Sequence, residues 1–147
     1  MSPGTDIAAY VAGFVAAEGY FGMDRTGTRF RLAVGLGAVD EGSCHLLLEL
    51  FGVGTVTRSP RRRAHYDDEV TWQVQALPAL VGVVVPFMDA HLPPSHKQMQ
   101  FIAWRAPLLE YWHHRARRVR PCGRAGCPAP SRCKGLCRRH YYLEFGR

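Results

Sequence analysis

The sequence has no run of apolar residues long enough to form a membrane-spanning helix, which needs about 20 of them. It also has no basic segment ahead of its first apolar stretch, so it lacks the pattern of a secretory signal. Its 147 residues are too few for two full enzymatic domains. These absences exclude a helical membrane protein and a large multidomain enzyme. They predict a cytoplasmic protein with no membrane partner.

The composition does not have the few apolar residues that are typical of a disordered chain. Apolar residues make up 47% of the sequence and aromatic residues 11%, which is enough to build a packed core. The formal net charge is +7, and a positive chain attracts polyanions. Nucleic acid is therefore the first partner to consider, and we expect the protein to associate with the nucleoid.

Acidic residues are nearly missing from the end of the chain. Residues 113–147 contain 10 Lys and Arg but 1 Glu, whereas residues 1–112 contain 9 Lys and Arg and 11 Asp and Glu. Four of the five cysteines also lie in the last segment, and Cys44 stands alone. This change in composition predicts a main domain over residues 1–112, followed by a basic linker and a small cysteine-rich module over residues 113–147.

Residue patterns in the main domain predict the order helix, hairpin, helix, hairpin, helix, helix. The approximate ranges are 7–18, 20–36, 40–51, 53–75, 77–92 and 96–112. The hairpins follow from apolar residues at every second position, and the helices from longer periodic stretches. Asp40 is a candidate N-cap and Gly52 a candidate stop for the second helix. Pro86 is expected to interrupt the helix over residues 77–92.

A carboxylate, Glu18, ends the first apolar helix. A charge in that position must be solvated, paired or bound to a metal, and an ordinary exposed helix end is the simplest alternative. Residues 11–19, VAGFVAAEG, resemble the LAGLIDADG motif position by position. The order of elements, the FGVGTV turn and a lysine in the last helix also resemble the single-motif members of the LAGLIDADG homing endonuclease family. The resemblance covers roughly residues 7–112.

The resemblance implies a fold class and an activity. The fold is α+β, with an αββαββα order and a four-stranded antiparallel sheet that binds DNA. The activity is site-specific hydrolysis of double-stranded DNA with a divalent metal, as a homodimer. Because the chain holds one motif copy, two such helices are expected to pack through Gly13 and Ala17, so that each protomer supplies one acid.

The same resemblance implies the catalytic residues. Glu18 aligns with the metal-binding acid, and Glu18 and Gly19 are the expected magnesium site, since Mg²⁺ prefers oxygen ligands. Lys97 aligns with a basic residue near the cleavage centre, where it would activate water or stabilise charge; a lone helical lysine is otherwise usually solvated. Ala16 and Ala38 replace polar residues that the family usually has. An alternative function therefore remains: a non-cleaving DNA-binding protein or an RNA maturase with this fold.

In this family the polar face of the sheet lies in the major groove of DNA, where side chains read base edges. The alternating pattern makes candidates of Tyr20, Asp24, Arg29, Arg31, Thr71, Gln73 and Gln75. Arginines in or beside the second hairpin loop are expected to contact phosphates; these are Arg58, Arg61, Arg62 and Arg63. The alternative is that all of them form the solvated face that antiparallel sheets commonly have.

The cysteine-rich module carries a strong metal-binding pattern, C-x₄-C-x₉-C-x₂-H. Its ligands are Cys122, Cys127, Cys137 and His140, a set that suits a closed tetrahedral zinc site of structural type. Disulfides are not expected in a cytoplasmic protein. Cys133 is a surplus donor that could replace Cys127 or Cys137. The GLCRRHY stretch resembles the short zinc knuckles of phage and bacterial DNA endonucleases.

Basic residues surround this module, and we expect some of them to contact DNA phosphates outside the footprint of the sheet. The candidates are Arg118, Arg120, Arg138 and Arg139. Two alternatives remain at this point: a basic tail that only adds solubility, and a zinc knuckle that binds another protein.

Overall fold

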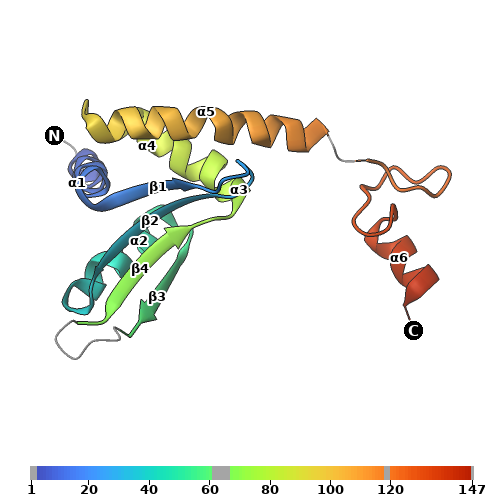
Figure 1. Cartoon of the computed structure of the whole chain (residues 1–147), viewed down its shortest axis with the longest axis horizontal. Coiled ribbons are helices and arrows are strands. Elements are labelled where there is room, and N and C mark those ends of the chain that lie inside the picture. Colours follow the sequence, from blue (N-terminus) through green and yellow to red (C-terminus); the bar gives the residue numbers. More distant parts are fainter. Residues whose placement is uncertain (1–2, 61–66, 118–119, 147) are drawn as a thin grey trace. The chain divides into compact units, whose positions relative to one another are not determined.

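The computed structural model describes residues 3–60, 67–117 and 120–146 (Figure 1). The chain divides into two compact units, Met1–Tyr111 and Trp112–Arg147. Within the described residues, no helix is both long enough and apolar enough to cross a membrane.

The first unit confirms the predicted α+β fold class with a four-stranded antiparallel sheet, in the strand order β1-β2-β4-β3. Its elements are α1 (Pro3–Glu18), β1 (Gly19–Met23), β2 (Phe30–Gly37), the short 3₁₀ helix η1 (Ala38–Asp40), α2 (Glu41–Phe51), β3 (Thr55–Ser59), β4 (Glu69–Val74), α3 (Leu77–Ala79), the π-helical segment η2 (Leu80–Val84), α4 (Val85–His91) and the part of α5 (His96–Arg117) up to Tyr111. Helices lie against the sheet on one side (Figure 1).

Helix α1 passes into strand β1 without a loop. This junction depends on Gly19, because a Cβ added there would lie 2.4 Å from the carbonyl oxygen of Val15. Helix α2 also ends at a glycine. Gly52 has a left-handed φ of 63° and donates its N–H to the carbonyl of Leu48. Asp40 precedes α2, but its side chain makes no capping hydrogen bond.

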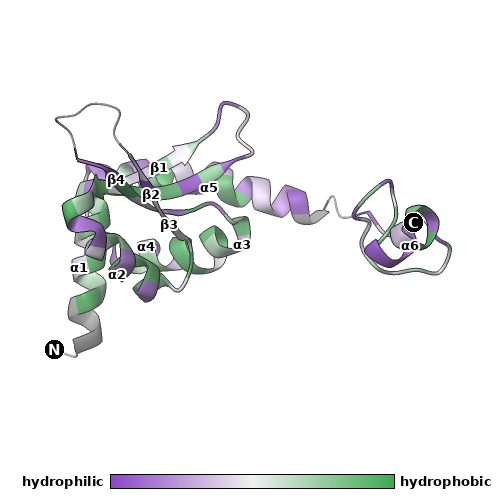
Figure 2. Ribbon diagram, turned by 90° about the horizontal axis from the view of Figure 1, so that it is seen from below, coloured by the Kyte–Doolittle hydropathy of each residue, from purple (hydrophilic) through white to green (hydrophobic). Residues whose placement is uncertain are grey.

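The hydrophobic core lies between the sheet and the helices. The sheet residues that point to the helices are almost completely buried: Leu32, Val34, Val70, Trp72 and Val74. Aromatic rings close the core on two sides. The ring of Phe51 in α2 lies 5.1 Å from that of Trp72, and the rings of Phe101 and Trp104 in α5 lie 5.4 and 5.2 Å from that of Phe21. Most of α3 and α4 is also hydrophobic (Figure 2).

The helical region around Pro86 differs from the prediction of a single interrupted helix. Three segments follow one another, and the wider π turn of η2 stands immediately before α4, with Pro86 in the first turn of α4. Proline cannot donate to the carbonyl four residues earlier, and its ring would collide with that carbonyl. A π turn ahead of the proline removes this conflict without ending the helix. Helix α5 also continues beyond its predicted end, to Arg117, with Pro107 inside it.

The second unit is small and has little apolar surface to bury. Two isolated bridges, Pro121 with Pro130 and Cys133 with Leu136, precede helix α6 (Arg138–Phe145). Its buried core consists of two cysteines and one leucine, with Tyr141 packed against them. A unit of this size needs a disulfide or a metal to be stable on its own.

Candidate functional site

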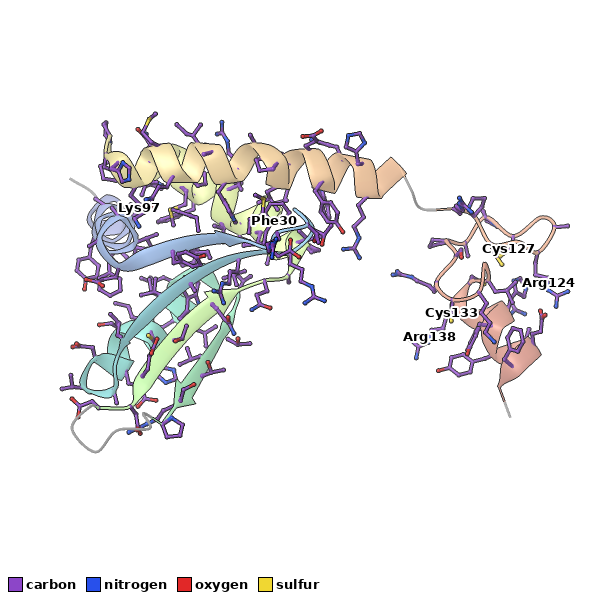
Figure 3. All side chains as sticks on the ribbon, in the orientation of Figure 1. Phe30, Lys97, Arg124, Cys127, Cys133 and Arg138 are labelled. Carbon is purple, nitrogen blue, oxygen red and sulfur yellow. The ribbon has the colours of Figure 1, made fainter. Side chains whose placement is uncertain are left out.

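At the carboxyl end of α1, Lys97 meets the neighbouring residues Glu18 and Gly19. All three were predicted as site residues, and Lys97 comes from a distant part of the sequence. Lys97, near the start of α5, donates a hydrogen bond of 2.7 Å from its Nζ atom to the carbonyl oxygen of Gly19. Glu18 is the neighbour of Gly19 and is exposed. Figure 3 shows Lys97 beside α1. The ammonium group of Lys97 therefore lies at the junction of α1 and β1, next to the predicted metal-binding acid.

The electrostatics of this junction favour a cation. The carboxyl end of a helix carries a partial negative charge from its free carbonyl groups, and Glu18 adds a full negative charge at the same place. A carboxylate and a backbone carbonyl are hard oxygen ligands of the kind that Mg²⁺ takes. The Gly19 carbonyl already accepts a hydrogen bond from the Lys97 ammonium group, so Glu18 is the exposed oxygen donor at this junction. A complete octahedral shell would need further oxygen ligands from water, phosphate or a second copy of the chain.

One face of α1 is exposed in the protomer. Tyr10, Gly13 and Ala17 lie three and four residues apart and are exposed, with 57% of Tyr10 accessible. A Cβ added to Gly13 would meet no atom within 4 Å among the described residues. The two residues predicted for the dimer interface thus lie side by side on an open, small-residue face. Ala16, on the same helix, is half-buried.

The exposed face of the sheet carries the polar residues that alternation predicted. Strand register pairs Tyr20 with Ala33, Ala33 with Gln73 and Gly35 with Thr71, so these positions share one face. Arg31 lies on the same face, opposite Gly22. Gln75 follows β4 and donates its amide to the side-chain oxygen of Gln73 at 2.9 Å.

Sequence reasoning missed two residues on this face. Thr55 pairs with Gln73 and Thr57 pairs with Thr71, so both threonines belong to the exposed face of β3. The signal was present, because Val56 between them is apolar and points the other way.

Asp24 was predicted to point toward DNA, and its carboxylate is used inside the β1–β2 turn. It accepts hydrogen bonds from the Thr26 hydroxyl at 2.8 Å, from the backbone N–H of Thr28 at 2.9 Å and from that of Arg29 at 3.2 Å. The Thr26 hydroxyl and the two backbone N–H groups lower the pKa of Asp24 to about 2. Arg29 itself is exposed directly after the turn.

Arg58 differs from its predicted placement. It pairs with Val70 in the sheet and therefore points to the helical side, opposite to Arg31. Its Nε atom donates to Asp68 at 2.9 Å and its terminal nitrogen to Glu41 at 3.4 Å. Two carboxylates thus neutralise the charge that was expected to contact phosphate. The other three predicted loop arginines, Arg61, Arg62 and Arg63, lie outside the described residues.

The second unit contains a cluster of three cysteines and one histidine. Its ligand atoms all lie within 4.8 Å of one another, and its members are Cys122, Cys127, Cys137 and His140. Tetrahedral zinc with Zn–S bonds of about 2.3 Å separates neighbouring sulfurs by about 3.8 Å. The Sγ atoms of Cys127 and Cys137 are 4.0 Å apart, and the Nδ1 atom of His140 lies 3.2 Å from the Sγ of Cys122. The donor set therefore fits a zinc ion.

Local structure places these ligands. Cys137 is the N-cap of α6, so His140 lies in the first turn of the same helix. The first two cysteines lie on either side of a turn in which Cys127 donates its N–H to the carbonyl of Arg124 at 3.1 Å. Cys133, the surplus cysteine, is exposed and does not belong to the cluster.

Hydrogen bonds favour the thiolate form of Cys122. Burial alone would raise the pKa of this thiol, but the backbone N–H groups of Arg124 and Cys137 and the side chain of His140 outweigh it and lower the pKa to about 6. A thiolate is the form that binds zinc. For Cys127 the backbone N–H of Ala129 favours the thiolate, but burial and the neighbouring Cys137 and Cys122 outweigh it and raise the pKa of the thiol. Cys122 is thus the ligand that is favoured as a thiolate before a metal binds.

Basic residues lie around this cluster. Arg120, Arg138 and Arg139 are exposed, and Arg118 lies outside the described residues. Arg138 lies over the ring of Tyr142, 6.0 Å from its centroid, and Arg124 forms an ion pair with Glu144. Exposed arginines therefore lie on and next to α6.

Neither the protein-family models nor the curated proteins contain a match to this chain. Solved structures do match it. The homing endonuclease I-TnaI superimposes with a TM-score of 0.58 at 23% identity, over 73% of this chain and 74% of that chain. The meganuclease I-SmaMI bound to uncleavable DNA gives a TM-score of 0.60 at 16% identity, over 73% of this chain and 38% of that chain.

A third match is the I-SmaMI LAGLIDADG homing endonuclease bound to cleaved DNA, with a TM-score of 0.60 at 15% identity. It covers 74% of this chain and 37% of that chain, so this chain spans well under half of I-SmaMI. Identities this low establish architecture alone. The chain has the fold of the LAGLIDADG homing endonucleases.

Proposed function

We propose that this chain is a site-specific, metal-dependent endonuclease that cuts double-stranded DNA as a homodimer. The observation that carries the proposal is the hydrogen bond from Lys97 to the carbonyl of Gly19, beside the exposed carboxylate of Glu18. An acid, a carbonyl oxygen and an ammonium group meet at the end of α1. The structurally similar proteins with this fold are homing endonucleases.

Each residue has a role that its position supports. Glu18 and the carbonyl of Gly19 would hold a divalent ion such as Mg²⁺, which when bound activates water and stabilises the leaving oxygen of a phosphodiester. Lys97 is held by the Gly19 carbonyl and places a positive charge where negative charge develops on the phosphate. Among the described residues Gly19 is the hydrogen-bond partner of this ammonium group, which leaves its other two N–H bonds for a phosphate oxygen.

Cleavage of both strands needs two acids, and the protomer supplies one. The exposed face of α1, with Gly13 and Ala17, allows close approach of a second α1 helix. A symmetric dimer formed through this face would bring two copies of Glu18 to a common centre, one for each DNA strand. The chemistry of a double-strand cut and the exposed surface of α1 both support the proposed homodimer.

DNA would be bound by two surfaces. The exposed face of the sheet offers Arg31, Thr71 and Gln73 for base edges in the major groove, together with Arg29. In the second unit, structural Zn²⁺ would hold the cysteine–histidine cluster, and Arg120, Arg138 and Arg139 would contact phosphates. Arg58 and Asp24 are left out of this proposal, because each is occupied by interactions within the protein.

The decisive experiment compares wild type with Glu18→Gln on a library of duplexes in the presence of Mg²⁺. We expect wild type to cut a subset of duplexes, and Glu18→Gln to bind that subset without cutting it. The matched control is Glu49→Gln, which removes one exposed carboxylate from α2 and should cut normally. Binding without scission by wild type, or equal cutting by Glu18→Gln, would refute the nuclease proposal. The first result would favour the non-cleaving alternative that Ala16 and Ala38 leave open.

A further inference from the structure

Tyr20 and Arg31 form a stacked pair on the exposed face of the sheet. The guanidinium carbon of Arg31 lies 5.2 Å from the centroid of the Tyr20 ring. The two residues come from neighbouring strands, in diagonal positions, since Tyr20 is opposite Ala33 and Arg31 is opposite Gly22. Both side chains are exposed, so the pair is formed at the surface and not in the core.

Gly22 makes room for this pair. A Cβ added to Gly22 would lie 2.6 Å from Cε1 of Tyr20 and 3.0 Å from both Cγ and Nε of Arg31. The two side chains therefore cross directly over the Cα atom of Gly22, which is buried even though it belongs to the exposed face. The carbonyl oxygen of Gly22 accepts a hydrogen bond of 2.9 Å from the indole of Trp104 in the core. This bond fixes the backbone beneath the pair.

We infer that Gly22 and Tyr20 are positioning residues that hold the Arg31 guanidinium ready to recognise a guanine. The inference rests on the proposed function, because it assumes that this face lies in the major groove. Guanine presents two acceptors there, N7 and O6, which match the two parallel N–H donors of a guanidinium. Stacking against Tyr20 covers one face of the guanidinium, and within the described part of the chain its N–H groups have no hydrogen-bond or ion-pair partner. Holding the side chain in advance also reduces the entropy lost on binding.

The position of the pair limits where this guanine lies. Gly22 is three residues beyond Gly19, which is roughly 10 Å along an extended strand. The guanine is therefore read near the cleaved bonds and not at the far end of the recognition site. Arg29, which follows the β1–β2 turn, lies farther from the Glu18 end of the strand.

The pair can be tested first in the protein without DNA. In the NMR spectrum of the full chain, the Tyr20 ring should shift the side-chain resonances of Arg31. We expect Tyr20→Phe to keep this ring-current shift, and Tyr20→Ala to abolish it. Gly22→Ala should reduce it, because the Tyr20 ring and the Cγ and Nε atoms of Arg31 would have to move away from the added Cβ. Unchanged Arg31 resonances in Tyr20→Ala would overturn the pair, whatever the protein does with DNA.

The recognition step is tested by selecting bound duplexes from a randomised double-stranded DNA library. We expect Arg31→Ala to lower the preference for guanine at one position by roughly tenfold to a hundredfold. Tyr20→Ala and Gly22→Ala should weaken the same preference, and Tyr20→Phe should retain it. Arg25→Ala removes an exposed positive charge from the β1–β2 turn and is the control for the loss of one charge; it should leave that position unchanged.

Three results would overturn the inference and are distinguishable. A uniform loss of affinity in Arg31→Ala, with a flatter salt dependence, would mean that Arg31 contacts phosphate. Loss of guanine preference in Arg31→Ala, but not in Tyr20→Ala or Gly22→Ala, would remove the positioning roles and leave the proposed function intact. Absence of duplex binding by wild type would refute the proposed function together with this inference.

Discussion

Lys97 and Gly19 are 78 residues apart in the chain and are joined by a hydrogen bond of 2.7 Å, which ties the start of α5 to the end of α1. A lysine Nζ that donates to a backbone carbonyl is held at a fixed point, whereas a lysine in solvent moves among many rotamers. The contact therefore gives Lys97 a defined place beside Glu18. It also makes the role of Lys97 testable without altering the acid.

Replacing Lys97 with Met should lower the rate of DNA cleavage by about 10² to 10³, the usual effect of removing one fixed donor near developing charge. DNA binding should change little, because a single positive charge at the cleavage centre adds little to the affinity of a large contact surface. Single-turnover cleavage and a binding titration measure the two effects separately. Gln100→Met, at an exposed position of the same helix, is the control. Equal cleavage by Lys97→Met and wild type would exclude a catalytic role for the lysine.

The second unit should bind about one zinc ion per chain through its four clustered ligands. Cys137→Ser should lose the metal and unfold residues 120–146, because this unit has little apolar surface to keep it folded without the ion. Cys133→Ser is a closely matched control, since Cys133 is exposed and outside the cluster. Metal analysis and amide hydrogen exchange give the two readouts. Loss of zinc in Cys133→Ser, or retention in Cys137→Ser, would contradict the ligand set.

Period-two alternation predicted much of the sheet, because one face is buried and a strand cannot shift by one residue without exposing its core. The same rule could have placed Arg58 on the helical side, since it lies two residues after Val56. It could also have placed Thr55 and Thr57 on the exposed side. The general expectation that loop arginines contact phosphate overrode a local pattern that was more informative.

Two other features could not be read from spacing alone. The contact between Lys97 and Gly19 depends on how α5 crosses the end of α1, and the first evidence for it in the sequence was a family resemblance. The π turn before Pro86 depends on the packing of the whole helical segment. The helix continues through Pro86, whereas a proline alone suggests that it ends there. Asp24 is different. Asp24 opens the stretch Asp-Arg-Thr-Gly-Thr, which is a turn pattern, so the use of its carboxylate inside the turn was predictable.

Asp24 should stabilise the protein in a pH-dependent way. Its pKa is lowered in the folded protein from 3.8 to about 2, so its hydrogen bonds contribute fully above about pH 4 and are lost as the pH falls toward 2. Asp24→Ala should therefore have a lower Tm than wild type at neutral pH, and the difference should shrink as the pH is lowered through this range. Asp40→Ala is the control, because Asp40 makes no side-chain capping bond. A difference in Tm that is constant with pH would refute the role of the ionised carboxylate.

Substitution of Gly13 separates folding from dimerisation. Gly13 lies in the middle of α1, and a Cβ there would meet no atom within 4 Å among the described residues of the protomer. Gly13→Leu should therefore stabilise the isolated helix by about 0.5 to 1 kcal/mol, because glycine is a poor helix former. The same side chain would obstruct the close approach of a second α1 helix. We expect a monomer by sedimentation that retains the fold but has lost cleavage of both strands.

The control for this substitution is Gly42→Leu. Gly42 is also helical and exposed, and a Cβ there likewise meets no atom within 4 Å among the described residues, but it lies on α2 and away from the proposed interface. It should leave the dimer and the cleavage activity as in wild type. Sedimentation then decides the assignment of the interface. If Gly13→Leu remains a dimer, or if Gly42→Leu becomes a monomer, the protomers associate through another surface, and α1 does not bring the two copies of Glu18 together.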